Sequence, residues 1–322
     1  FFNVGAISEL KLRASYGLIG NDAIGNVNDR FFYLSSVNLN DGVYGAIFGE
    51  EFGYSRPGIS ISRYSNPNIS WEKSEQINLG LDLSLFHSSV NLTADVYRQH
   101  RTNILLNRSY LGPSMGLMAI PQANTGEAQS QGIDLALDYQ KQLSQNWWTS
   151  LRGNFTYATS EILKYDEIDY PDEMAYRSKV GRSIAQEFGY IAERLFVDDQ
   201  EVNNSPTQFG TYMGGDIKYY DMNGDGVISD ADRVPIGHPT TPEIIYGFGG
   251  TIGYKNFDFS FFFQGSARSS FFIDSEAVSP FVINGSAQNG LLKVIADDHW
   301  SEEKRNLYAF WPRLSNTFID NN

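Results

Sequence analysis

One segment of the sequence carries closely spaced oxygen-bearing side chains of the kind that bind calcium. Residues 221–232 read DMNGDGVISDAD and fit the loop pattern D-x-[DN]-x-[DN]-G, with an acidic residue at the twelfth position. Gly226 permits the sharp turn that the pattern requires, and Ile228 supplies an apolar anchor. The predicted ligands of this Ca²⁺ are Asp221, Asn223, Asp225, Val227 (through its carbonyl), Ser229 (often through water) and Asp232.

The flanks of this loop differ from those of a helix–loop–helix calcium site. Asp232 stands where a glutamate usually binds the ion through both oxygens, and its shorter side chain predicts weaker binding. Pro235, Gly237 and Pro239 interrupt any helix after the loop. The pattern indicates a structural Ca²⁺ that fixes a loop. It leaves open an Asx-rich turn that is closed by its own hydrogen bonds without a metal.

Other motifs that could support catalysis lack their partners. Residues 112–116 read GPSMG and fit the GxSxG string of hydrolases, but the surrounding prolines and glycines predict a turn instead of a nucleophile elbow. The sequence has no cysteine, and its four histidines are scattered without metal-binding spacing. We therefore expect no enzyme, no catalytic residue and no organic cofactor.

Charge and hydropathy exclude further classes of protein. The 322 residues contain 24 Lys and Arg against 38 Asp and Glu, a net charge of −14, so a nucleic-acid-binding surface is not expected. No apolar run approaches the roughly 18 residues of a membrane-spanning helix. Aromatic residues make up 14 % of the chain and there are 30 glycines, a mixture that suits strands and turns.

Apolar and polar residues alternate along much of the chain, as they do in strands with two different faces. From 76 to 85, every second residue is Ile or Leu, and the residues between them are Gln, Asn, Gly, Asp and Ser. Short links at 86–89, 144–146 and 255–256 predict hairpins. The predicted strands are 9–16, 76–85, 90–96, 133–139, 149–157, 246–254 and 257–263.

Three properties favour a membrane β-barrel over a soluble β-sandwich, which would show the same alternation. The strands approach the length that a tilted membrane strand needs. Tight turns alternate with long excursions, as in barrels with short periplasmic turns and long outer loops. Aromatic residues lie near the strand ends, as at a bilayer interface: Tyr16, Tyr97, Tyr139, Trp147, Trp148, Tyr157, Tyr246 and Tyr254.

The two faces of such strands and the loops have different expected roles. Residues 158–245 hold 17 acidic against 7 basic residues, so we expect this long acidic loop region to project into water. Loop aromatics could stack on sugar rings or pack the loops: Tyr44, Phe48, Phe52, Tyr54, Tyr170, Tyr212 and Tyr219. The residues expected to face a wet lumen are Arg13, Asn78, Asp82, Thr93, Asp95, Asp134, Asp138, Arg152 and Asn154.

A series of short motifs indicates the family. They are NPNISWE (66–72), NLGLD (78–82), NTGE (124–127), GID (132–134), GRSIAQEFGY (181–190), LF (195–196), GDIKYYDMNGDG (215–226), DRVPIG (232–237), YGF (246–248), FDFS (257–260), FFQG (262–265) and WPR (311–313). In this order they resemble the SusC/RagA class of TonB-dependent outer-membrane transporters of Bacteroidetes. The resemblance extends over nearly the whole chain.

The resemblance implies an all-β fold, part of a large antiparallel transmembrane barrel of about 22 strands with long extracellular loops. It implies location in the bacterial outer membrane and import of oligosaccharides, or in some members peptides, with energy from TonB. The implied partners are a SusD-like lipoprotein, TonB and outer-membrane lipid. The resemblance identifies no substrate-binding residue.

Residues 1–322 are expected to be a partial barrel from the later-middle part of such a protein, without the TonB box, the plug, the early strands and the last strands. Roughly eight to eleven strands are expected. Since open sheet edges cannot persist in lipid, we expect this piece alone neither to insert nor to transport. Two alternatives stay open: a secreted or surface-attached calcium-dependent adhesin, and a passive porin.

Overall fold

The computed structural model describes residues 6–22, 31, 33–284 and 287–318. The chain divides into two compact units. The sheet unit comprises Phe1–Asp169, Ser178–Ile184 and Pro242–Arg268, and the loop unit comprises Tyr170–Arg177, Ala185–Thr241 and Ser269–Asn322. No helix among the described residues has the length and apolar character needed to cross a membrane.

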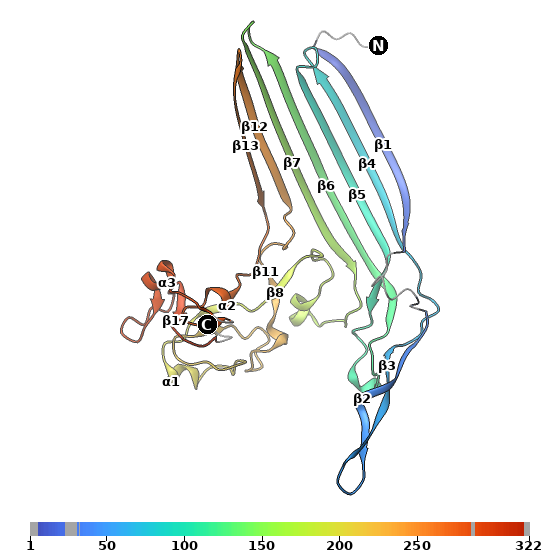
Figure 1. The fold of residues 1–322 in the computed structure, drawn as a ribbon, viewed down its shortest axis with the longest axis vertical. Coiled ribbons are helices and arrows are strands. Elements are labelled where there is room, and N and C mark those ends of the chain that lie inside the picture. The colour runs from blue at the N-terminus through green and yellow to red at the C-terminus, as the bar shows by residue number, and fades with distance from the viewer. Residues whose placement is uncertain (1–5, 23–30, 32, 285–286, 319–322) are drawn as a thin grey trace. The chain divides into compact units, whose positions relative to one another are not determined.

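The sheet unit is built on a seven-stranded antiparallel sheet in the order β1-β4-β5-β6-β7-β12-β13, with β1 and β13 at its edges (Figure 1). The seven predicted strands are confirmed, and most of them are longer than expected. Their bounds are β1 (Ile7–Asn21), β4 (Glu72–Leu85), β5 (Val90–Asn107), β6 (Gln122–Gln142), β7 (Trp147–Lys164), β12 (Ile244–Tyr254) and β13 (Phe257–Ala267).

The expected number of strands was wrong, because this sheet has seven. Much of the chain after β7 and after β13 forms the short elements of the loop unit instead of membrane-length strands. The alternation also missed a separate hairpin of β2 (Ser36–Phe48) and β3 (Tyr54–Arg63), inserted between β1 and β4. A single 3-10 turn, η1 (Pro113–Met115), lies between β5 and β6.

Three tight turns join strands at one end of the sheet. The β4–β5 turn places Phe86, His87 and Ser88 in the left-handed region, with φ of 53°, 59° and 63°. The β12–β13 turn places Lys255 there too, with φ of 53°. The connections at the opposite end are long and contain the β2–β3 hairpin and most of the acidic stretch. The predicted plan of short turns at one end and long loops at the other is therefore confirmed.

One face of the sheet presents continuous apolar rows that no other layer covers among the described residues. Leu12 is 78 % exposed, Leu79 57 % and Phe257 80 %. Ala128 is the one apolar residue of these seven strands among the buried apolar residues described, so the sheet has no water-excluding core. An exposed apolar area of this size requires an apolar solvent or partner. The arrangement suits lipid on one face and excludes a sandwich with these leucines inside.

Aromatic residues border the apolar rows, with two exceptions to the prediction. Trp147 and Tyr254 pack at the tight-turn end, their ring centroids 4.5 Å apart. Tyr97 and Trp148, expected at the lipid interface, lie on the other face, because they share the strand alternation of Asp95 and Arg152. There they cover glycines of the neighbouring strand, where a Cβ would collide with the aromatic ring.

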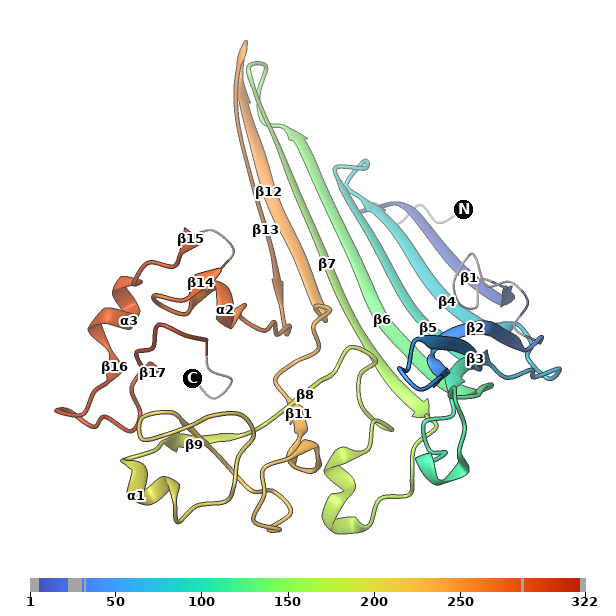
Figure 2. The same ribbon diagram turned by 60° about the horizontal axis from the view of Figure 1, so that its bottom comes forward.

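The loop unit consists of short elements joined by long loops (Figure 2). Its apolar core includes Phe196, Ile228, Ile295 and Trp300, all at most 7 % exposed. The elements are η2 (Asp172–Arg177), β8 (Glu187–Gly189), β9 (Ala192–Leu195), α1 (Asp199–Val202), β10 (Ile217–Tyr219), η3 (Asp230–Asp232), β11 (Val234–Ile236), α2 (Ser275–Val278), β14 (Ile283–Asn284), β15 (Ala287–Gln288), α3 (Lys293–Asp297), β16 (His299–Trp300) and β17 (Trp311–Arg313).

Candidate functional site

The polar face of the sheet carries an ion-pair cluster that spans three strands. The Arg13 guanidinium on β1 donates to both carboxylate oxygens of Asp82 on β4, at 2.9 and 3.0 Å. It also donates to both oxygens of Asp95 on β5, at 3.0 and 2.9 Å. Such bidentate pairs are among the stronger hydrogen bonds in proteins. The cluster cross-links the strands on the face expected to line the lumen.

Gly80 makes this long reach possible. It is the register partner of Arg13 on one side and of Asp95 on the other. A Cβ at this position would lie 2.6 Å from both the Arg13 Cζ and an Asp95 carboxylate oxygen. The glycine thus leaves a path for the guanidinium across β4. Thr93 lies on the same polar face and is hydrogen-bonded to Asp82. The other residues expected to line the lumen share this face in the strand register: Asn78, Asp134, Asp138, Arg152 and Asn154.

The predicted calcium loop is a compact turn in the loop unit. The Asp221 carboxylate accepts the N–H groups of Gly224 and Gly226, both at 2.8 Å. The Asn223 Oδ1 accepts the Asp225 N–H at 3.0 Å, and the Asp225 Oδ1 accepts the Val227 N–H at 2.8 Å. The structure therefore brings the first three predicted ligands into one turn, on its exposed side.

Asp232 closes the same loop from inside. It is fully buried, and its two carboxylate oxygens accept the N–H groups of Met222 at 2.9 Å and Ser229 at 2.7 Å. Ser229 forms a capping box with Asp232 at the start of η3. The predicted anchor Ile228 is also buried. Within the described parts of the chain, no group of three or more His, Cys, Asp or Glu has metal-binding geometry.

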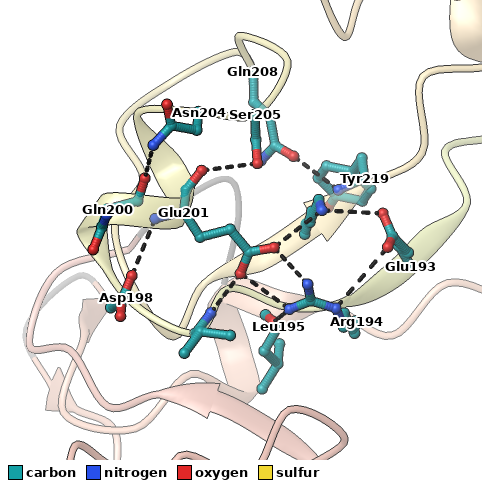
Figure 3. Close-up of polar contacts among 12 residues, drawn as sticks. Glu193, Arg194, Leu195, Asp198, Gln200, Glu201, Asn204, Ser205, Gln208 and Tyr219 are labelled. Carbon is teal, nitrogen blue, oxygen red and sulfur yellow. Dashed lines mark hydrogen bonds and ion pairs between the residues drawn. The ribbon is translucent and has the colours of Figure 1, made fainter.

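A second charged network fixes the loop unit around Glu201 (Figure 3). Its carboxylate accepts from the Arg194 guanidinium (Nη1, 3.0 Å), from the Lys218 ammonium (3.1 Å) and from the Val197 N–H (2.9 Å). Burial alone would raise the pKa of Glu201, but these donors together lower it to about 2. The network joins β9, α1 and β10, and no sequence pattern pointed to it.

Two motifs far apart in the sequence meet in a buried ion pair. Asp216, from the GDIKYY motif, is fully buried, and its carboxylate lies 2.8 Å from the Nε of Arg313 in the WPR motif. Asp216 also accepts the Met213 N–H at 2.9 Å, and the Arg313 N–H donates to the Gly215 carbonyl at 3.0 Å. Burial raises the pKa of Asp216, although Met213 and Arg313 oppose the shift. The motifs signalled both residues, but not that they pair.

The loop aromatics divide into two groups. In the loop unit, Tyr212 stacks on Phe196 and Tyr219 stacks on Phe209, with ring centroids 5.9 and 5.6 Å apart. Arg177 lies over the Tyr170 ring. These rings pack against their own loops. In the β2–β3 hairpin, Tyr44, Phe48, Phe52 and Tyr54 are all more than half exposed. Arg56 lies over the Tyr54 ring, 4.7 Å from its centroid, so Tyr44, Phe48 and Phe52 are the better candidates for contact with a ligand.

The GxSxG string forms no nucleophile elbow. Ser114 lies in η1, a single 3-10 turn, and β5 has ended at Asn107, well before it. Gly116 follows with φ of 64°, a left-handed conformation typical of turns. The turn interpretation of this segment agrees with the structure.

Comparison with known proteins identifies the architecture. The family described as "TonB dependent receptor-like, beta-barrel" matches residues 2–264. TonB-dependent receptor P26 of Formosa agariphila is 31 % identical over 82 % of this chain, and TonB-dependent receptor SusC of Bacteroides thetaiotaomicron is 27 % identical over 84 %. In each case the chain spans 26 % of the relative's length.

Solved structures agree in fold. The structure of the RagAB peptide transporter superposes with a TM-score of 0.66 at 21 % identity, covering 98 % of this chain and 32 % of that one. The RagAB peptide importer in its open-open state gives a TM-score of 0.64 at 22 % identity, covering 99 % of this chain and 33 % of that one. At this level of identity the likeness concerns the fold.

Proposed function

This chain belongs to the TonB-dependent receptor-like β-barrel family of the outer membrane, and from that premise we propose a role in nutrient import. The full-length protein takes up an oligosaccharide or a peptide with energy from TonB. The family consists of transporters and receptors and not of enzymes. The observation that carries the proposal is the sheet with an uncovered apolar face and a charged opposite face.

The physical argument follows from the two faces. Lipid satisfies the exposed leucines and phenylalanines, whereas the Arg13 cluster needs water or protein around it. A large barrel would leak solutes, so a plug must close it. The outer membrane has no ATP, and moving the plug requires energy from outside. In a soluble adhesin, these apolar rows would be exposed to water, which is unfavourable.

Uptake by the full-length protein in its native host tests the proposal. A strain without the gene is supplied with labelled oligosaccharides or peptides and compared with the complemented strain and with a strain lacking TonB. We expect uptake of one substrate class to need both the gene and TonB. Uptake that needs the gene but not TonB would indicate a passive porin, and unchanged uptake would contradict import.

The exposed β2–β3 hairpin is the proposed substrate contact. Stacking of one ring on a sugar or peptide group contributes about 0.5–1.5 kcal/mol, or roughly a twofold to tenfold effect. We expect Phe52→Ala to raise the KM of uptake by that factor. Val43→Ala is the matched control, because Val43 is 87 % exposed in the same hairpin and carries no ring. Equal effects of both changes would exclude a role of the ring.

We further propose that a SusD-like surface lipoprotein binds the full-length protein. The support is the similarity to SusC in sequence and to the RagAB peptide importer in fold. Affinity purification of the tagged protein from outer membranes, followed by mass spectrometry, tests this partner. Recovery of the barrel protein without a lipoprotein, under detergent conditions that preserve a known barrel–lipoprotein complex, would contradict it.

A structural Ca²⁺ in the 221–232 loop remains a proposal. Asp221, Asn223 and Asp225 gather hard oxygen donors in one exposed turn, and these suit calcium. Asp232 is the weaker candidate, because it is fully buried and the other three residues are not. Calorimetric titration of the full-length protein with millimolar Ca²⁺ should give a heat that Asp225→Ala abolishes. Absence of heat with the unchanged protein would refute the site.

A further inference from the structure

The apolar face of the sheet changes character at one register level. Leu79, Val96, Ile133 and Tyr157 are successive partners across β4, β5, β6 and β7. Two residues further from the tight turns, the partners become Ile77, Arg98, Gln131 and Thr159. The next level is Glu75, His100, Gln129 and Glu161. The apolar band thus ends where Arg98 begins a polar belt.

A shallow groove lies on this boundary. Its volume is about 400 Å³, and its apolar wall includes Ile77, Leu79, Val96 and Ile133. Tyr157 also lines it, and Arg98, Gln131 and Thr159 supply its polar lining. The groove has apolar walls on its tight-turn side and a cation at its polar rim, an arrangement that suits an amphipathic ligand. The apolar part of that ligand would lie toward the band.

Among the residues that the structure describes, no anionic side chain pairs with Arg98. Its side chain is exposed, and the hydrogen bonds described for it go to the Oε1 of Gln129, a neutral amide; the Nε bond measures 3.0 Å. Glu75 and Glu161 lie one register level further out. At this end of β4 to β7, Arg98 is therefore the charged group nearest the apolar band among the described residues of this face. An arginine at such a boundary is suited to a phosphate.

The end of the sheet that carries Arg98 identifies the lipid leaflet. The tight turns mark the periplasmic end and the long connections the outer end of an outer-membrane barrel. The Arg98 level lies toward the long connections. The outer leaflet of such membranes contains phosphorylated glycolipids with acyl chains. We propose that the groove binds one of these lipids, with an acyl chain along Leu79 and Val96 and a phosphate at Arg98.

The test uses the full-length protein, purified in detergent and incubated with lipid A. One sample receives phosphorylated lipid A and another receives the same lipid without phosphates, and native mass spectrometry measures the bound lipid. We expect Arg98→Gln to reduce binding of the phosphorylated lipid about tenfold, and Arg98→Lys to retain most of it. Heat-modifiable migration on gels confirms that each variant is a folded barrel.

Lys141 provides the matched control. It is an exposed cation on the same face of β6, at the tight-turn end, opposite Thr149 of β7. Lys141→Gln should leave lipid A binding unchanged. Equal binding by the protein and by Arg98→Gln would overturn the proposal, as would equal binding of the lipid with and without phosphate. Competition by inorganic phosphate at the same concentration as the lipid would indicate a free-anion site and also overturn it.

Discussion

The buried pair of Asp216 and Arg313 offers the sharpest test of how the loop unit is held together. Asp216→Ala removes a carboxylate that lies 2.8 Å from the Arg313 Nε and also accepts the Met213 N–H at 2.9 Å. The Arg313 side chain, 18 % exposed, then loses this anion in a region that water barely reaches. Removing one partner of a buried pair costs about 3–5 kcal/mol.

Hydrogen exchange of the full-length protein measures this effect locally. The Phe196 N–H donates to the Asp216 carbonyl and the Arg313 N–H to the Gly215 carbonyl, at 2.9 and 3.0 Å. A loss of 3 kcal/mol raises exchange of these amides by about a hundredfold or more, if they open with the unit.

Asp230→Asn is the control for the same experiment. The Asp230 side chain is 86 % exposed and lies 3.8 Å from Arg233, so an exposed pair of this kind contributes at most about 1 kcal/mol. We expect its exchange effect to stay below about fivefold. If Asp216→Ala changed exchange no more than Asp230→Asn, the buried pair would not hold these motifs together.

Three further predictions concern charge and packing. The pKa of Glu201 is about 2 in the folded protein, below its usual value. The ionised carboxylate therefore stabilises the loop unit above about pH 4.5, and this stabilisation is lost as the pH falls toward 2. We expect the hydrogen-exchange protection of the loop unit to vary less between these two pH values in Glu201→Gln. Leu81→Arg, on the apolar face, should cost about 2–4 kcal/mol in urea unfolding of the barrel, whereas Asn78→Arg on the polar face of the same strand should cost far less. Gly80→Val should lower the urea midpoint more than Gly17→Ala, because a Cβ at Gly80 collides with the ion-pair cluster and one at Gly17 meets no atom within 4 Å.

Alternation in the sequence determined the long strands and their hairpins. A strand between lipid and water repeats its chemistry every second residue, and Leu79, Leu81 and Leu83 show this without any partner strand. The same rule failed for β2 and β3, which have no continuous apolar face to alternate against. The prediction for Tyr97 and Trp148 considered only that they lie near strand ends. It placed them at the lipid interface, although both lie on the polar face.

Tertiary structure decided which distant residues meet. The residue types alone predicted that the side-chain oxygens of Asp221, Asn223 and Asp225 lie together in one turn, because this loop pattern is local in sequence. The pairing of Asp216 with Arg313, and the passage of Arg13 over Gly80 to Asp95, depend on strand register and on the path of long loops. The local pattern of a strand indicates whether each of its faces meets lipid or water. The contacts between distant segments arise from the geometry of the whole chain, which no single segment contains.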